Sequence, residues 1–194
     1  MAYYEELSPI LYRIVSERFL RNQDLCKLLY YYPENCEHVE DAYNFNPLSC
    51  EDIPNTNVLY MHGIYPMPKM PDAKDEKKAY LCAYLNGGYE VEDNLGYRNV
   101  VLNVDIVCHL DCWCIKEGFR VYDIMNQVDL LLNDQLTDLP IVNRPYLRGF
   151  QVRTYSDYFY GVQMLYNLKV NSNISCPIRP KMNNLTENMI YKYN

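Results

Sequence analysis

The sequence predicts an α/β protein of the α+β type, with a mixed, largely antiparallel sheet of about four to five strands and helices packed on one face. Three observations predict this fold. Apolar residues occupy every even position from 102 to 112, the period becomes helical between 119 and 132, and two strand-like runs follow up to residue 170. We expect a long irregular insertion and an extended C-terminal tail beside this core.

The central element is a strand predicted between Val101 and Trp113. Its even positions are all apolar: Leu102, Val104, Ile106, Cys108, Leu110 and Cys112. Its odd positions are half polar: Asn103, Asp105, Val107, His109 and Asp111. Because successive side chains of a strand point to opposite faces, we expect the even face to contact a core and the odd face to lie against water or a partner.

A helix is predicted after a turn at Gly118, between Phe119 and Leu132. Its apolar residues recur at helical spacing: Val121, Ile124, Met125, Val128, Leu131 and Leu132. This stripe can pack on the even face of the strand, and Asn133-Asp134 is expected to end the helix.

A hairpin is predicted next, because residues 146–155 and 160–170 both alternate in the manner of strands. Ser156-Asp157 lies between them and is typical of a turn.

The first part of the chain, residues 8–32, is predicted to form two helices that cover the same sheet face. Ser8 is the expected N-cap of the first, with Pro9 at its first helical position and its end near Leu20. Asn22 is the expected N-cap of the second, which stops before Pro33.

Residues 33–78 show no lasting periodicity and are predicted to be an irregular insertion or arm that packs on a neighbouring molecule. A strand follows at residues 79–86, with a turn at Gly87-Gly88 and a further loop at Gly96. Residues 79–170 form the predicted core of a single domain spanning 1–194, and 171–194 its extended tail.

The amino-acid composition argues against several classes of function. The 194 residues carry a net charge of -7, which argues against a protein that grips nucleic acid by its phosphates. We expect no signal peptide and no membrane span. The 8 cysteines are expected to be reduced thiols, and the 21 tyrosines provide amphipathic contact area suited to protein interfaces.

Cys108, Cys112 and Cys114, with His109 nearby, could suggest zinc. On a strand, however, the three cysteines share one face and His109 points to the other, so we interpret them as core thiols. Asp105 and Asp111 lie roughly 20 Å apart along a strand, too far for an acid/base couple.

A Cys–His nucleophile pair, Cys36 with His38 or Cys50 with His62, stays open, because such pairs meet in space rather than along the chain. No other spacing indicates catalysis. We therefore expect no catalytic residue, no metal and no cofactor, and hence no enzyme.

The order of elements resembles the tail-terminator (tail-completion or neck ring) proteins of tailed bacteriophages. The residues that suggest it are the strand 100–112, the segment 118–133 that leads into and forms the helix, and the closing strand 158–166. The resemblance covers residues 79–170 and, more loosely, the N-terminal helices.

The resemblance implies a structural virion protein, made in the host bacterial cytoplasm, that forms a ring of six or twelve copies. Such a ring joins the portal or connector to the tail, and DNA passes through it without sequence-specific binding. An acidic balance suits this bore because it repels phosphate. The candidate interface or channel-facing residues are Asn103, Asp105, Val107, His109 and Asp111.

Two other classes stay open at this point. One is a non-viral α/β protein-binding module, which would have the same core and remain monomeric. The other is a small thiol-dependent enzyme, which would need convergent Cys, His or Asp groups in a pocket.

Overall fold

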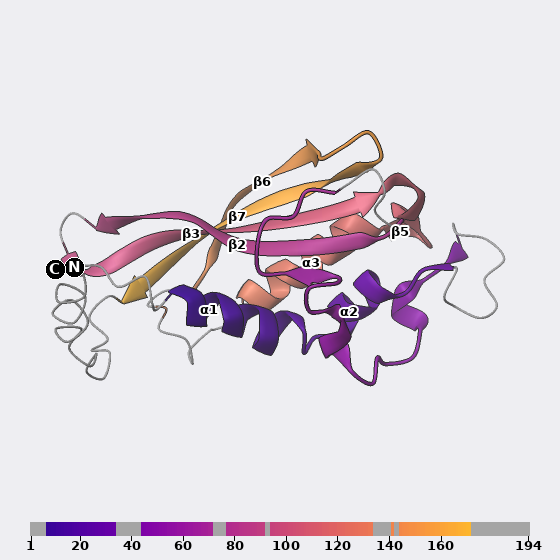
Figure 1. Cartoon of the computed structure of the whole chain (residues 1–194), viewed down its shortest axis with the longest axis horizontal. Coiled ribbons are helices and arrows are strands. Elements are labelled where there is room, and N and C mark those ends of the chain that lie inside the picture. The colour runs from indigo at the N-terminus through magenta and orange to yellow at the C-terminus, as the bar shows by residue number, and fades with distance from the viewer. Residues whose placement is uncertain are drawn as a thin grey trace, which may run out of the picture.

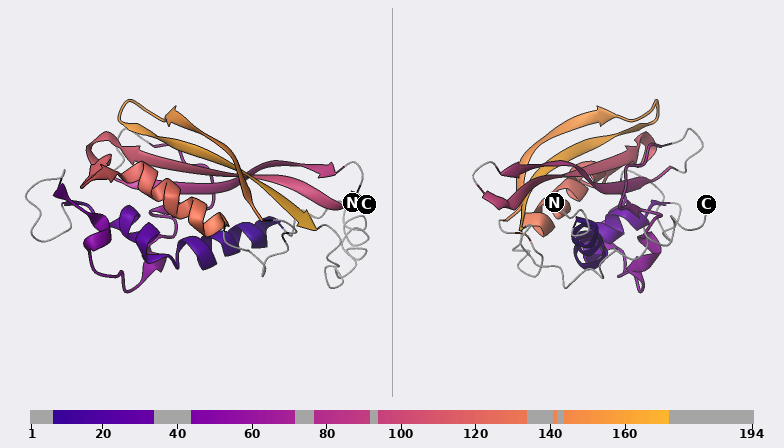
Figure 2. Two further views of the ribbon diagram at one scale, coloured as in Figure 1. Left: turned by 180° about the vertical axis from the view of Figure 1, so that it is seen from behind. Right: turned by 60° about the vertical axis from the view of Figure 1, so that its left-hand side comes forward.

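The computed structural model describes residues 7–33, 44–71, 77–91, 94–133, 141 and 144–171; of residues 89–91, 94–96 and 171 it describes the backbone alone. The predicted tail therefore lies outside the described residues beyond Asn171. Figure 1 shows a sheet with helices α1, α2 and α3 on one side, and Figure 2 shows the sheet curving over this helical layer. The predicted fold class is confirmed.

Five strands form the main sheet in the order β1-β2-β3-β7-β6. Their bounds are β1 (Ile64–Tyr65), β2 (Ala79–Val91), β3 (Asn94–His109), β6 (Tyr146–Thr154) and β7 (Phe159–Asn171). Only β1 is parallel to its neighbour, and the other pairs are antiparallel. A second, small hairpin joins β4 (Cys114–Ile115) to β5 (Gly118–Phe119).

The helical layer follows the predicted pattern. The N-terminal helix consists of α1 (Leu7–Arg13) and a π-helical continuation, η2 (Ile14–Phe19), so Ser8 lies inside the helix and the predicted N-cap is wrong. Asn22 does cap α2 (Gln23–Tyr30), because its side chain accepts the Leu25 N–H at 2.7 Å. In α3 (Arg120–Asn133) four members of the predicted stripe are fully buried: Val121, Ile124, Val128 and Leu132.

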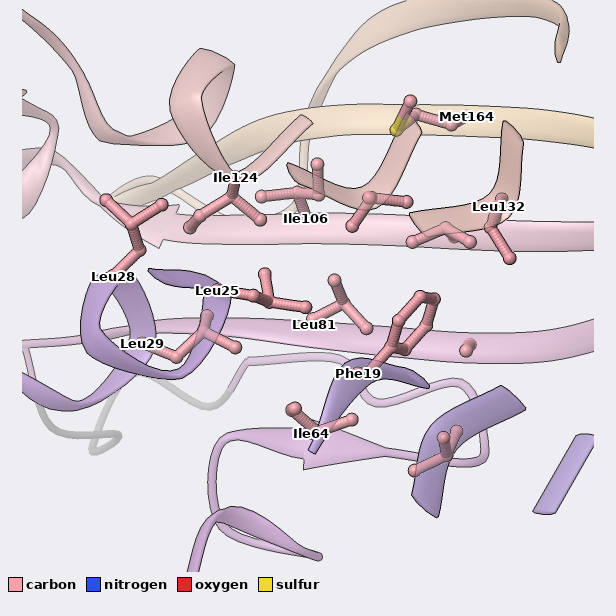
Figure 3. Packing of buried hydrophobic residues seen from close by; sticks show 14 of the residues in the cluster. Phe19, Leu25, Leu28, Leu29, Ile64, Leu81, Ile106, Ile124, Leu132 and Met164 are labelled. Carbon is pink, nitrogen blue, oxygen red and sulfur yellow. The ribbon is translucent and has the colours of Figure 1, made fainter. Parts of the chain in front are cut away.

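The core lies between these helices and the even face of β3. Figure 3 shows Phe19 and Leu25 from the helical layer packing toward Leu81 and Ile106 of the sheet. Burying a side chain of this size stabilises the fold by about 1.5–3 kcal/mol, so this packing is the main driving force for the fold.

Arg120 of α3 is buried, with 1% of its surface exposed, and its side chain connects α3 to the end of α2 and to the turn after β3. Its guanidinium donates to the Leu28, Tyr31 and Cys112 carbonyl oxygens and lies over the Tyr32 ring, 4.6 Å from its centroid. Carbonyl dipoles and an aromatic face thus stabilise the buried cation.

Three predicted boundaries on the strands are wrong. β3 ends at His109 instead of Trp113, because Leu110–Cys112 forms a 3₁₀ turn (η7) in which Trp113 N–H donates to the Leu110 carbonyl. Gly87-Gly88 forms no hairpin turn: Gly87, at φ +105°, lies in a register irregularity, and β2 continues to Val91. The loop expected at Gly96 is part of β3.

The described part of the predicted insertion, residues 44–71, packs on its own chain. Its predicted contact with a neighbouring molecule stays a prediction. Gln23 exchanges two hydrogen bonds with the Ile53 backbone, and the Gly63 carbonyl accepts from Leu81 N–H at 2.8 Å beside the edge strand β1. Burial of Phe45, Leu59 and Ile64 explains this, because these apolar residues find their contacts within the chain.

Candidate subunit interface

A buried polar network occupies the face of the sheet opposite the helices. Asp105 on β3 accepts from the Tyr84 hydroxyl of β2 and from the Gln163 amide of β7, both at 2.8 Å. Asn103 donates to the same Tyr84 hydroxyl at 3.3 Å. The strand registers pair Tyr84 with Asn103 and Asp105 with Gln163, so the network is a direct product of strand alignment.

The tyrosine hydroxyls in and beside this network keep their protons at neutral pH. Burial raises the pKa of the Tyr84 hydroxyl and that of the neighbouring Tyr155, so both remain protonated at neutral pH. Both carboxylate oxygens of Asp105 already accept hydrogen bonds from neutral donors. This arrangement satisfies a buried carboxylate and stabilises the sheet.

Val107 and His109 lie farther along the same face. Val107 joins a small apolar cluster with Tyr65, Tyr80, Cys82 and Phe159. The His109 ring stacks on Tyr158 at a centroid distance of 6.0 Å, and its Nδ1 accepts the Asp111 N–H. In the neutral ring the proton is therefore on Nε2.

Four of the five candidate interface residues are buried within the single chain, and their predicted contact with a channel or a neighbour stays a prediction. Asn103, Asp105, Val107 and His109 are at most 8% exposed within the single chain. Over the apolar cluster that contains Val107, Lys69 lies above the rings of Tyr65 and Tyr80, 5.0 and 4.7 Å from their centroids. The predicted alternation of β3 side chains between two faces is confirmed, and the segment that contains Lys69 packs on the second face.

Asp111 is different, because it lies in the turn after β3 and its side chain is 55% exposed. It pairs with Lys77 at 2.6 Å, and this hydrogen bond lowers the carboxyl pKa. Its predicted place at a subunit or channel surface stays a prediction.

Two of the three cysteines considered for zinc donate hydrogen bonds to backbone carbonyls: Cys108 to that of His109 and Cys112 to that of Lys77. No three His, Cys, Asp or Glu side chains are arranged to hold a metal ion in the part of the chain that the structure describes. Burial raises the pKa of the Cys26 and Cys82 thiols to about 12, and it raises that of Cys108 as well.

These pKa values matter for the thiol-enzyme alternative, since the thiolate is the nucleophile. The three buried thiols stay protonated at neutral pH. Cys50 is half-buried, whereas Cys36 and His38 lie outside the described residues.

An exposed apolar surface occurs instead on β6, the last strand of the sheet. Phe150 and Val152 are 53% and 60% exposed and share the helix-covered face, opposite Met164 and Val162 of β7. Sequence reasoning did not single them out. The sequence does contain a signal that β6 is an edge strand, namely the charged residues Arg148 and Arg153. Charged side chains are common on edge strands.

A second exposed apolar surface lies at the end of β3. The Tyr122 ring contacts those of Trp113 and Phe119 edge-on, and the Leu110 N–H donates to the Tyr158 carbonyl at 3.0 Å. Leu110, Phe119 and Tyr158 are each about half exposed. Clustered exposed aromatic residues are typical of protein contact sites.

Comparisons with known proteins add one positive finding. A search of the curated proteins finds no match. No helix among the described residues is both long and apolar enough to cross a bilayer. A family model described as YomW matches residues 22–168, which include α2, α3 and nearly the whole sheet. That name is of a Bacillus prophage type, which points to a phage-associated protein. The chain belongs to the YomW family.

Proposed function

We propose that this chain is a structural virion protein of a tailed bacteriophage. In this proposal it is a ring-forming neck or tail-terminator component that joins the portal or connector to the tail. DNA passes through the ring without sequence-specific binding, and the protein contains no catalytic site, metal or cofactor.

One observation carries the proposal: the sheet ends in a nine-residue edge strand, β6, that exposes Phe150 and Val152 to solvent. An exposed apolar edge strand is a liability for a monomer and a ready contact for an assembly. The phage-type family supports the virion context.

Two further features are compatible with a DNA channel and a passive role. The net charge of -7 favours a bore to which DNA phosphates do not adhere. The buried thiols are held in their protonated form, which disfavours thiol chemistry.

The test is the native mass of the purified full chain at several concentrations. We expect a discrete closed species of six or twelve copies, visible as rings by negative-stain electron microscopy. Antibody labelling of purified phage particles should then place the protein at the neck. A strict monomer that is also absent from particles would contradict the proposal and favour a binding module.

A further inference from the structure

Exposed apolar side chains gather at the end of the sheet where β3 stops. Four of them, called the end patch from here on, come from η7, β5, the first turn of α3 and the residue before β7: Leu110, Phe119, Tyr122 and Tyr158. Figure 1 shows β5 and the loop that joins β6 to β7 at this same end. Large exposed side chains from four separate elements thus form one surface, which is typical of a contact site.

Backbone hydrogen bonds hold the end patch in place. The Leu110 N–H donates to the Tyr158 carbonyl at 3.0 Å, and the Trp113 N–H donates to the Leu110 carbonyl at 3.2 Å. The Arg120 N–H then donates to the Trp113 carbonyl at 2.9 Å, which ties the start of α3 to the same turn. Because the surface is already ordered in the free chain, a ligand would not have to pay for ordering it.

The Tyr158 ring offers one open face. Its plane lies 11° from that of the His109 ring, at a centroid distance of 6.0 Å, so one face is turned toward His109. The residue is nevertheless 56% exposed, which leaves the opposite face and the ring edge to solvent. The planar guanidinium of arginine stacks on such faces, where it gains both cation–π attraction and apolar contact.

Acidic side chains border the two most exposed rings of the patch. Glu117 lies two residues before Phe119, and Asp157 directly precedes Tyr158. Both carboxylates are exposed, and neither forms an ion pair with any residue that the structure describes. The one lysine beside them, Lys116, leaves this border with an excess of negative charge, which is complementary to a cationic ligand.

We propose that the end patch docks an extended, arginine-bearing segment of another protein. An arginine of that segment stacks on the open face of Tyr158 and pairs with Asp157 or Glu117, while its apolar residues contact Phe119 and Leu110. Nucleic acid also stacks on aromatic rings, but the acidic border repels its phosphates. This inference goes beyond the proposed ring and does not depend on it.

The experiment uses Trp113 as a reporter in the full chain. It is the single tryptophan of the protein, and its ring contacts that of Tyr122 at a centroid distance of 6.5 Å. The probe is the capped peptide Gly-Arg-Leu-Arg-Leu-Arg-Gly at low salt. Because this peptide contains no tryptophan, any change in tryptophan emission reports on the neighbourhood of the end patch.

We expect a saturable change of emission with a dissociation constant below about 1 mM. The matched peptide carries citrulline, the neutral isostere of arginine, at each arginine position. It should bind at least about tenfold more weakly, because it lacks the charge for the cation–π contact and for the carboxylate pairs. Equal binding of the two peptides would overturn the proposal.

Variants of the rings locate the binding. Tyr158→Ala should weaken binding of the arginine peptide by about tenfold or more. Tyr146→Ala is the matched control, because Tyr146 is 53% exposed at the opposite end of β6, and its affinity should be that of the parent. The same loss in both variants would overturn the assignment to the end patch.

Variants of the acidic border test the charge without removing a ring. Glu117→Gln combined with Asp157→Asn should weaken binding by about threefold to tenfold at low salt, with a smaller loss at high salt. An affinity equal to that of the parent at low salt would contradict the charge complementarity.

Two further outcomes would overturn the proposal. One is the absence of any saturable change with the arginine peptide up to about 1 mM. The other is equal or tighter binding of a single-stranded oligonucleotide, which would assign the rings to base stacking. Native mass is measured on the same samples, so a monomer that binds the peptide removes only the ring, and a ring that does not bind it removes only this inference.

Discussion

β3 and β6 belong to one sheet, with β7 between them, yet their surroundings are opposite. Residues 102–109 of β3 are buried on both faces of the sheet, so that even the polar Asn103 is 1% exposed. Among the residues that the structure describes, no strand pairs with the outer edge of β6, and its apolar Phe150 is 53% exposed. Alternation therefore tells which side chains share a face, while the position of a strand in the sheet and the segments that cover it decide exposure.

Two glycines of the hairpin test this difference most sharply. A Cβ on Gly161 of β7 would overlap the Ile106 carbonyl of β3, whereas one on Gly149 of β6 would meet nothing within 4 Å. We expect Gly161→Ala to destabilise by about 4 kcal/mol or more, or to prevent folding. Gly149→Ala should be neutral or stabilise by up to about 1 kcal/mol. Urea unfolding of both variants measures this, and equal effects would contradict the comparison.

Core truncation should give the next largest contrast. Ile106→Ala on β3 should lower the free energy of unfolding by about 2–5 kcal/mol, because Ile106 is fully buried. Val152→Ala on β6 should change it by less than about 0.5 kcal/mol in the monomer. A large loss from Val152→Ala at a protein concentration where native mass shows only monomer would mean that β6 is covered within the single chain.

The polar network of the second face provides a smaller effect. Asp105→Ala removes the acceptor for both Tyr84 and Gln163, and we expect a loss of about 2–3 kcal/mol. Thr154→Ala on the exposed β6 is the control and should be nearly neutral. If Asp105→Ala were also neutral in thermal and urea unfolding, the network would contribute nothing to stability.

The pH dependence should be the smallest effect when it is counted per side chain. Burial raises the pKa of Cys26 and Cys82 from 9.0 to about 12, so above pH 9 the unfolded state loses protons that the folded state retains. Stability is therefore complete below pH 9 and falls as the pH rises, by about 1.4 kcal/mol per thiol at pH 10.

The double variant Cys26→Ala, Cys82→Ala is the control for this slope. Its unfolding free energy should change less between pH 9 and 10 than that of the parent, whatever its starting stability. An unchanged slope would show that these thiols titrate alike in both states.

Much of the fold follows from local pattern. The helical stripe of α3, the capping Asn22 and the hairpin of β6 and β7 were all predicted, because each depends on a few neighbouring residues. The errors lie where a tertiary contact overrides a local signal. Gly87-Gly88 is typical of a turn, but the neighbouring β3 continues past it and holds β2 extended to Val91.

The candidate interface was less predictable. Asn103 and Asp105 were expected at a surface because polar side chains on a strand usually meet water, and Phe150 was not singled out. Buried polar groups need partners, and here these come from Tyr84 and Gln163, distant along the chain. No spacing within β3 indicates that such partners exist.

By itself the sequence determined the main helices and strands, their apolar faces, the thiol-rich core and an acidic balance, since these depend on periodicity and composition. The tertiary structure decided which strand lies at the edge and which face is covered, and it placed residues 44–71 on their own chain. The physical reason is that exposure belongs to the whole arrangement: a side chain is buried by whichever segments pack over it, near or far in the sequence.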